Sequence, residues 1–181
     1  MKLSRGKSLL LLGVILVVID QVIKVLVKTN MSLGEQIFVI GEWFRLCFVE
    51  NEGMAFGMSF GGKVGKFLLS FFRIILSGAL IWWISSLIKK GAPKGALVGL
   101  TMITAGAIGN IIDCLFYGII WDYAPFMFGH VVDMFYFPII RTAEKVIFFS
   151  PVFNFADSCV TCGAFYLILF QWKFFMNEDK K

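Results

Sequence analysis

The sequence predicts an all-α membrane protein with four transmembrane helices and a small β-rich outer loop. Of its 181 residues, 59% are hydrophobic and 16% are charged, whereas a soluble domain carries roughly 25% charged residues. The mean hydropathy is +0.83. A helix needs about 20 apolar residues to cross a bilayer core of about 30 Å. Four stretches meet this requirement, and they cover residues 9–27, 67–88, 95–112 and 153–172.

The first stretch begins like a secretory signal peptide, because Lys2, Arg5 and Lys7 precede a run rich in Leu and Val. The run is long, however, and no small-residue cleavage site follows it. We therefore interpret it as a retained first span. No linker or internal repeat divides the sequence, so we expect one membrane domain over residues 1–181, with outer loops at 28–66 and 113–152.

Lys and Arg residues are concentrated on one side of the predicted bundle. They precede the first span, crowd the tight turn between the second and third spans, and follow the fourth span. Because cytoplasmic connections carry the excess of Lys and Arg, both termini are predicted in the cytoplasm and both long loops outside. The net charge of +5 then reflects topology, and we expect no nucleic-acid partner.

Polar side chains from separate parts of the chain are predicted at one depth, near the outer membrane boundary. Ionisable groups in a membrane span are costly and are therefore functional candidates. Asp20, for example, lies roughly 17 Å along a first helix that rises outward. The other residues end the third span, open the fourth, or precede the second. The group comprises Asp20, Asn51, Glu52, Asn110, Asp113, Asn154 and Asp157.

Each of these residues also has a purely structural interpretation. Asp20 and Lys24 are four residues apart on one helix face, so they can neutralise each other. Asn110 fits an interhelical hydrogen bond, and Asp113 and Asp157 fit the capping or solvation of helix ends. In the second span, Arg73 is close enough to the outer end to snorkel toward water.

The cysteines fit neither a disulfide framework nor a zinc site. His130 is the only histidine, and Cys159-x-x-Cys162 lies on a predicted span without a redox-type βαβ context. We interpret the cysteines as small apolar packing residues, and we expect no metal and no cofactor. They are Cys47, Cys114, Cys159 and Cys162.

The two outer loops differ in pattern. The first is β-branched and aromatic over residues 37–50, with a break at Gly41, which predicts short strands in a small sheet on the membrane surface. In the second loop, residues 142–149 fit either a short interfacial helix or an ordinary connector.

Five motifs occur in order along the chain, and together they resemble the lipoprotein signal peptidase family, also called signal peptidase II. The resemblance covers nearly the whole length. The motifs are Asp20-Gln-x-x-Lys24, Asn51-Glu-Gly-Met-Ala-Phe56, Ala105-Gly-Ala-Ile-Gly-Asn-Ile-Ile-Asp113, Val131-Val-Asp133 and Phe153-Asn-Phe-Ala-Asp-Ser158.

The resemblance implies an aspartic endopeptidase of the bacterial cytoplasmic (inner) membrane. Such an enzyme cleaves the signal peptide from diacylglyceryl-modified prolipoproteins, just before the lipidated cysteine, near the outer leaflet. Asp133 and Asp157 would be the catalytic pair. Membrane lipids are expected partners, and we expect a monomer. Residues that would shape or support the pocket are Asp20, Lys24, Asn51, Gly53, Asn110, Asp113 and Asn154.

The chain departs from the family pattern at two positions. Cys114 stands where the family usually has Arg, and Met54 precedes Ala-Phe where Ala or Ser is usual. We expect another cation or a backbone donor to replace the missing Arg. The candidates from the outer loops are Arg45, Lys63 and Arg141.

The residues by themselves leave two other classes of protein open. One is a small transporter or proton-coupled channel, in which Asp20, Lys24, Asp113 and Asp157 form a relay. The gathering of these groups at a single boundary counts against a path across the bilayer. The other class is a non-enzymatic assembly scaffold, which would need neither Asp133 nor Asp157.

Overall fold

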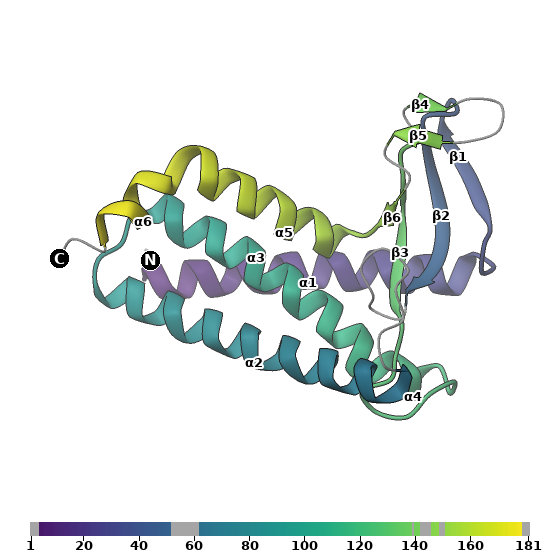
Figure 1. The fold of residues 1–181 in the computed structure, drawn as a ribbon, viewed down its shortest axis with the longest axis horizontal. Coiled ribbons are helices and arrows are strands. Elements are labelled where there is room, and N and C mark those ends of the chain that lie inside the picture. Colours follow the sequence, from purple (N-terminus) through teal and green to yellow (C-terminus); the bar gives the residue numbers. More distant parts are fainter. Residues whose placement is uncertain (1–3, 52–61, 139, 142–145, 149–150, 179–181) are drawn as a thin grey trace.

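Four long apolar helices form a bundle in the computed structural model, which describes residues 4–51, 62–138, 140–141, 146–148 and 151–178 (Figure 1). Each helix is long and apolar enough to cross a membrane, which confirms the predicted fold class. The helices are Arg5–Asn30 (α1), Gly62–Lys89 (α2), Lys94–Ile120 and Phe155–Met176.

The third and fourth membrane helices each contain a π-helical turn. The third consists of α3 (Lys94–Ile112), the turn η2 (Asp113–Tyr117) and α4 (Gly118–Ile120). The fourth consists of α5 (Phe155–Tyr166), η3 (Leu167–Gln171) and α6 (Trp172–Glu178). The third helix continues to residue 120, beyond the predicted end at residue 112. Asp113 therefore lies inside a helix, in a π-helical turn of the kind often found at functional sites, and it does not cap a helix end.

The helices turn apolar side chains outward and polar side chains inward. On α1, Leu10 and Val18 are exposed, whereas Asp20 and Lys24 are buried. On α2, the phenylalanines at 71 and 72 are exposed, whereas Ser70 is buried. This pattern suits a bundle surrounded by lipid, in which polar groups find partners inside the protein.

Glycines on α3 allow two helices to approach it closely. A Cβ atom on Gly106 would lie 2.3 Å from the carbonyl oxygen of Ala156 on α5. A Cβ atom on Gly109 would lie 2.6 Å from Oδ2 of Asp20 on α1. Small residues commonly permit such contacts between membrane helices. As a result, α3 brings α1 and α5 together around the polar residues described below.

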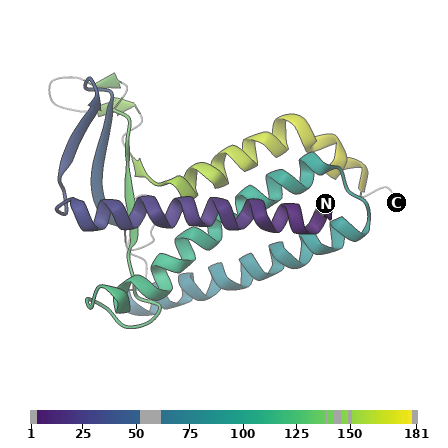
Figure 2. The same ribbon diagram turned by 180° about the vertical axis from the view of Figure 1, so that it is seen from behind.

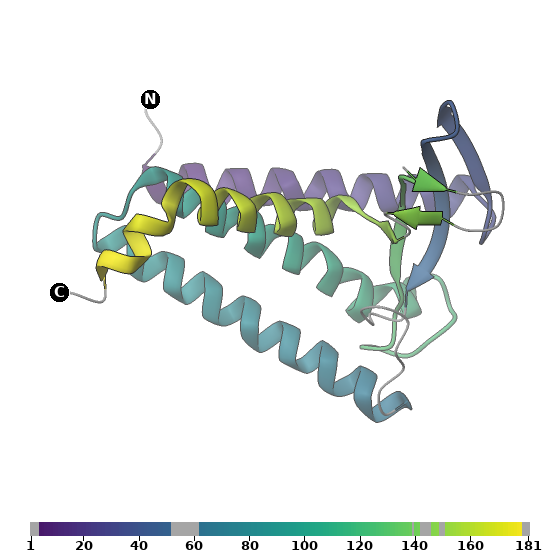
Figure 3. The same cartoon turned by 45° about the horizontal axis from the view of Figure 1, so that its top comes forward.

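A four-stranded antiparallel sheet lies across one end of the bundle, as Figures 1 and 3 show. Its strand order is β1-β2-β3-β6, and its first two strands are those predicted in the first loop. Their antiparallel register places Val49 opposite Asp133 and Asn51 opposite Val131. The strands are Gln36–Ile40 (β1), Phe44–Asn51 (β2), Val131–Tyr136 (β3) and Val152–Phe153 (β6).

A second, two-stranded sheet occupies part of the region predicted as an interfacial helix or a connector. Strand β4 (Ile140–Arg141) pairs with β5 (Val146–Phe148) in antiparallel fashion. The interfacial-helix interpretation is therefore wrong for residues 146–148, where β-branched and aromatic residues pair as a strand. The rest of that predicted helix lies outside the described residues.

Both ends of the chain lie at the end of the bundle opposite the sheets. Figure 2, seen from behind, shows the start of α1, the α2–α3 turn and the C-terminal helix together at that end. The cysteines are free: Cys47, Cys114 and Cys159 are buried, whereas Cys162 is exposed on α5. The packing interpretation thus holds for three of them, and Cys162 lies on the outer surface of the bundle.

Candidate active site

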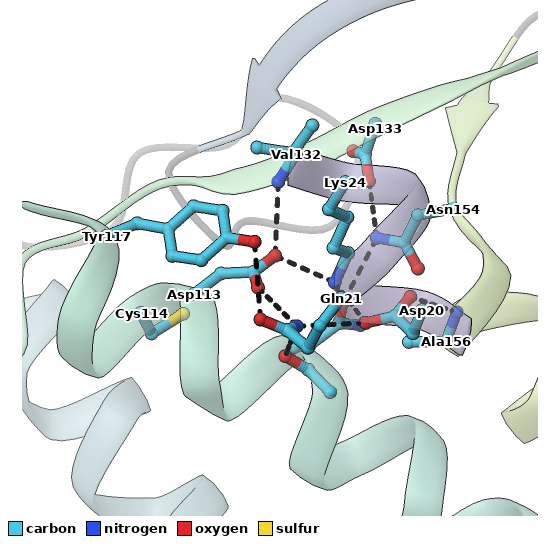
Figure 4. A network of polar contacts seen from close by, with 12 residues as sticks. Asp20, Gln21, Lys24, Asp113, Cys114, Tyr117, Val132, Asp133, Asn154 and Ala156 are labelled. Carbon is cyan, nitrogen blue, oxygen red and sulfur yellow. Dashed lines mark hydrogen bonds and ion pairs between the residues drawn. The ribbon is translucent and has the colours of Figure 1, made fainter. Parts of the chain in front are cut away.

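Lys24 is the centre of a buried polar network beside the sheet (Figure 4). Its Nζ lies 2.9 Å from Asp20 Oδ2 and 2.7 Å from Asp113 Oδ2, and it donates to Asn110 Oδ1 at 2.8 Å. An ammonium group has three N–H donors, and each has an acceptor here. The predicted Asp20–Lys24 pair is therefore present, but it extends to α3 and η2 and joins two helices.

Gln21 and Tyr117 complete this network, although neither was among the predicted site residues. Gln21 Nε2 donates to Asp113 Oδ1 at 2.9 Å and to the carbonyl oxygen of Gly109 at 3.1 Å. Tyr117 Oη donates to Gln21 Oε1 at 3.2 Å. The signal for Gln21 was its place in the Asp20-Gln-x-x-Lys24 motif. Tyr117 lies one helical turn after Asp113, a spacing that by itself indicates only a shared face.

Asp20 also fixes the start of α5. Its Oδ1 accepts a hydrogen bond from the backbone N–H of Ala156 at 2.8 Å. The first N–H groups of a helix have no partner inside the helix, and a carboxylate there is favoured by the helix dipole. Asp20 therefore holds α5 against α1 and sets the position of Asp157, the next residue.

Asn154 and Asp157 form a capping box at the N-terminus of α5. Asn154 Oδ1 accepts from the backbone N–H of Asp157 at 2.9 Å, and Asp157 Oδ2 accepts from the backbone N–H of Asn154 at 3.2 Å. Asp157 Oδ1 also accepts from Asn110 Nδ2 at 2.8 Å. The predicted capping role of Asp157 is thus present, and the cap leaves its carboxylate inside the network.

Asp133 reaches the same network from strand β3. Its Oδ1 accepts from Asn154 Nδ2 at 2.7 Å, and its Oδ2 accepts from Asn51 Nδ2 at 3.2 Å. The residue is only 3% exposed. Burial, followed by the charge of Asp157, raises the pKa of Asp133 to about 7, although hydrogen bonds from Asn51 and Asn154 oppose this rise.

Two asparagine amides connect the two aspartates that the sequence singled out. Asn110 donates to Asp157, and its Oδ1 accepts from Asn154 Nδ2 at 3.0 Å. That same Nδ2 group donates to Asp133. All the predicted site residues except Gly53, which lies outside the described residues, therefore belong to one hydrogen-bonded network.

The environments of the two carboxyl groups differ in a way that suits acid–base chemistry. Asp157 lies at a helix N-terminus, where negative charge is stabilised, and it accepts two N–H bonds. Asp133 is buried on a strand and has a raised pKa. Neighbouring carboxyl groups in unequal environments can divide the roles of base and acid. Such a pair can activate water for attack on a carbonyl carbon.

Among the described residues, Arg73 is a cation whose side chain contacts Cys114. Its Nη1 donates to Cys114 Sγ at 3.4 Å, so the guanidinium of this half-buried residue contacts the third helix, and the snorkelling interpretation stays a prediction. Of the predicted replacements, Arg45 bonds to Gln36 of β1 and to the carbonyl oxygen of Glu42 in the β1–β2 turn, and Lys63 is exposed. The side chain of Arg141 lies outside the described residues.

Within the part of the chain that the structure describes, no group of three or more His, Cys, Asp or Glu side chains is placed to hold a metal ion. The carboxylates of the network are instead paired with Lys24, amide groups and backbone N–H groups.

A bundle of membrane helices with two aspartates linked through asparagine amides at one end is an arrangement that suits the class of membrane-embedded aspartic peptidases. A family model described as signal peptidase (SPase) II matches residues 12–173, and the chain belongs to this family of aspartic peptidases. The match covers every site residue described above.

Relatives and a solved structure agree with this assignment. A lipoprotein signal peptidase from Porphyromonas gingivalis is 42% identical, over 93% of this chain and 84% of the relative. One from Amoebophilus asiaticus is 38% identical, over 87% and 75%. A solved bacterial membrane enzyme superposes with a TM-score of 0.66 at 26% identity, covering 97% of this chain and 93% of its own.

Proposed function

We propose that this multi-pass membrane enzyme cleaves diacylglyceryl-modified prolipoproteins just before the lipidated cysteine, with Asp133 and Asp157 as its catalytic pair. The family acts on prolipoproteins by removing their signal peptides. The observation that carries the assignment to these two residues is the hydrogen-bonded chain Asp157–Asn110–Asn154–Asp133. It links two carboxyl groups from a helix and a strand.

In the proposed mechanism, Asp157 is the base and Asp133 carries the proton shared by the pair. Asp157 removes a proton from a water molecule, and the resulting hydroxide attacks the scissile carbonyl carbon. Asp133 donates its proton toward the carbonyl oxygen as the tetrahedral intermediate forms. Collapse of that intermediate breaks the C–N bond: Asp133 takes back a proton from a hydroxyl of the intermediate as the carbonyl re-forms, and Asp157 gives the proton that it took from water to the leaving amine. No covalent enzyme intermediate and no metal takes part.

The remaining network residues position this pair. Lys24 holds Asp20, Asp113 and Asn110 together, and Asn110 contacts Asp157 directly. Positioning of reacting groups can contribute several kcal/mol to catalysis. We therefore assign Asp20, Lys24, Asn110, Asp113 and Asn154 to support of the site, and Asn51 to hydrogen bonding of Asp133.

We also propose that the termini are cytoplasmic and that the site lies near the outer leaflet. Lys89, Lys90 and Lys94 flank the α2–α3 turn, at the end of the bundle where both termini lie. Lys and Arg mark the cytoplasmic side. The network and the sheet are at the opposite end, where the acyl chains of the substrate would be anchored. We expect lipid contact along the apolar helix faces and activity as a monomer.

The experiment that tests this function is a cleavage assay with purified protein and a diacylglyceryl-modified precursor peptide. Mass spectrometry should find a product that begins with the lipidated cysteine. The same peptide with an unmodified cysteine is the matched control and should be cleaved much more slowly. Equal cleavage of both peptides, or cleavage at another bond, would contradict the proposed substrate class.

Arg73 is expected to bind a polar oxygen of the substrate in place of the family arginine missing at position 114. Guanidinium groups donate several hydrogen bonds to carbonyl or phosphate oxygens, and losing one such bond costs on the order of 1–3 kcal/mol. Arg73→Ala should therefore raise KM about tenfold and lower kcat less. Cys114→Ala should be nearly silent, because it removes only a weak sulfur acceptor and leaves the Arg73 cation in place.

The kinetic comparison includes Lys63→Ala, which removes an exposed cation from the same helix and should change neither constant. Loss of activity in Cys114→Ala, with normal kinetics in Arg73→Ala, would reject this assignment. It would instead give the thiol a direct role.

A further inference from the structure

The β2–β3 ribbon has two faces, and Asp133 lies on only one of them. Side chains alternate between faces along a strand, and directly paired residues share a face. Val49 pairs with Asp133 and Asn51 with Val131, so Asn51 and Asp133 lie on one face. Glu50 pairs with Val132, and it projects from the opposite face.

On that opposite face, Glu50 joins an ionic cluster that the proposed mechanism does not use. One carboxylate oxygen, Oε1, forms an ion pair with Lys28 in the last turn of α1. The other, Oε2, lies 3.1 Å from His130 Nδ1, immediately before β3. Burial tends to raise the pKa of Glu50, but hydrogen bonds from Lys28 and His130 and their charges bring it below its usual value. Glu50 is therefore an anion bound at both oxygens.

Aromatic rings hold the other members of this cluster in place. Lys28 Nζ lies 4.9 Å from the ring centroid of Tyr123 and 5.3 Å from that of Trp121, which are favourable cation–π distances. Tyr123 Oη accepts a hydrogen bond from the backbone N–H of His130 at 2.7 Å, and their ring centroids are 5.0 Å apart. The cluster thus fixes Glu50 to the end of α1 and to the chain that enters β3.

The position of Glu50 matters because Asn51 is the last residue of β2. Its hydrogen bond to Asp133 is 3.2 Å long, near the upper limit for an N–H···O bond. A displacement of a few tenths of an ångström at this strand end would break it. Glu50, the adjacent residue, is tied on both sides and can prevent that displacement.

We propose that Glu50 is a positioning residue of the aspartate site. Anchored by Lys28 and His130, it holds the end of β2 so that Asn51 stays bonded to Asp133. The inference rests on the proposed catalytic role of Asp133. It assigns the ionic cluster on the far face of the ribbon a function in the reaction, although none of its members touches the reacting carboxyl groups.

The test compares Glu50→Gln, Asn51→Ala and the double variant in the precursor-cleavage assay across pH. Glu50→Gln should lower kcat about tenfold with KM nearly unchanged. The hydrogen bond from Asn51 favours ionised Asp133, so its loss should move the alkaline limb of the pH–rate profile to higher pH. The charges of Asp157 and Lys24 also act on Asp133. Both charges are the same in all these variants. Because Glu50 acts through Asn51, the double variant should be no worse than Asn51→Ala alone.

Glu35→Gln is the matched control, since Glu35 is an exposed carboxylate that accepts a local hydrogen bond from the Ser32 N–H. It should behave as wild type. If Glu50→Gln does not fold, His130→Ala serves as a second variant, because it leaves the Lys28–Glu50 pair intact. That variant should shift the alkaline limb in the same direction by a smaller amount.

Any of three results would overturn the inference. The losses of kcat in the two single variants could multiply in the double variant, the alkaline limb could stay unmoved in both single variants, or KM alone could rise. Asp133→Asn, assayed in parallel, separates this failure from failure of the proposed function. An active Asp133→Asn protein would reject the catalytic pair itself. An inactive Asp133→Asn protein combined with any of the three contrary results would reject only the positioning role of Glu50.

Discussion

Asp133→Asn and Asp157→Asn are each expected to lower cleavage of a diacylglyceryl-modified precursor by at least about a thousandfold. Either substitution keeps the size of the side chain but removes one partner of the shared proton. Because the pair acts as a unit, the double variant should be hardly worse than either single one. The measurement is the initial rate of product formation by purified proteins at equal concentration.

Folding must be separated from catalysis in this experiment. Asp133 and Asp157 both accept hydrogen bonds, so each variant needs a thermal unfolding midpoint in detergent beside its rate. Asp122→Asn offers a matched control, because Asp122 is an exposed aspartate outside the network. Substantial turnover by a folded Asp133→Asn or Asp157→Asn protein would exclude the catalytic pair.

Lys24→Met is expected to cause the largest loss of stability. The substitution leaves Asp20 and Asp113 buried without the cation between them. Removing one partner of a buried ion pair costs about 3–5 kcal/mol, because the remaining charge is not compensated. The thermal midpoint of the purified variant should fall accordingly, and little folded protein should be recovered from membranes.

Companion variants show how the charges of this cluster couple. Asp20→Asn leaves the Lys24–Asp113 pair intact, so its loss of stability should be smaller than that of Lys24→Met. Adding Asp20→Asn to Lys24→Met should restore part of the stability, because one unpaired carboxylate disappears. A stable but inactive double variant would place these residues in support of the site. Full activity in a stable double variant would remove both from it, and Lys63→Met serves as the exposed control.

Helix depths estimated from the sequence could bring together only those site residues that lie on the spans or directly beside their ends. The rise of a helix per residue and the distribution of Lys and Arg were enough to place Asp20, Asn110 and Asp157 near one boundary. Asp133 lies on a strand in an outer loop, where no helical rise fixes depth. Only the family resemblance singled it out.

Other features depend on tertiary contacts that no local pattern records. The contact of Arg73 with Cys114 follows from the packing of α2 against the third helix. The cluster around Glu50 joins residues 22 and 80 positions apart in the chain. The π-helical turn at Asp113 extends a helix that composition alone appeared to end at residue 112. Long-range pairing and irregular helical turns of this kind are not encoded in hydropathy.

The pH dependence of kcat/KM for the wild-type protein tests the shared proton most directly. Asp133 has a pKa of about 7 in this environment, so the proposed acid is protonated below that pH and loses its proton above it. The profile should be bell-shaped, with an alkaline limb near pH 7 that belongs to the coupled pair. Activity that stays constant or keeps rising from pH 7 to about pH 9, in protein that remains folded throughout, would contradict an aspartate pair that works with one proton.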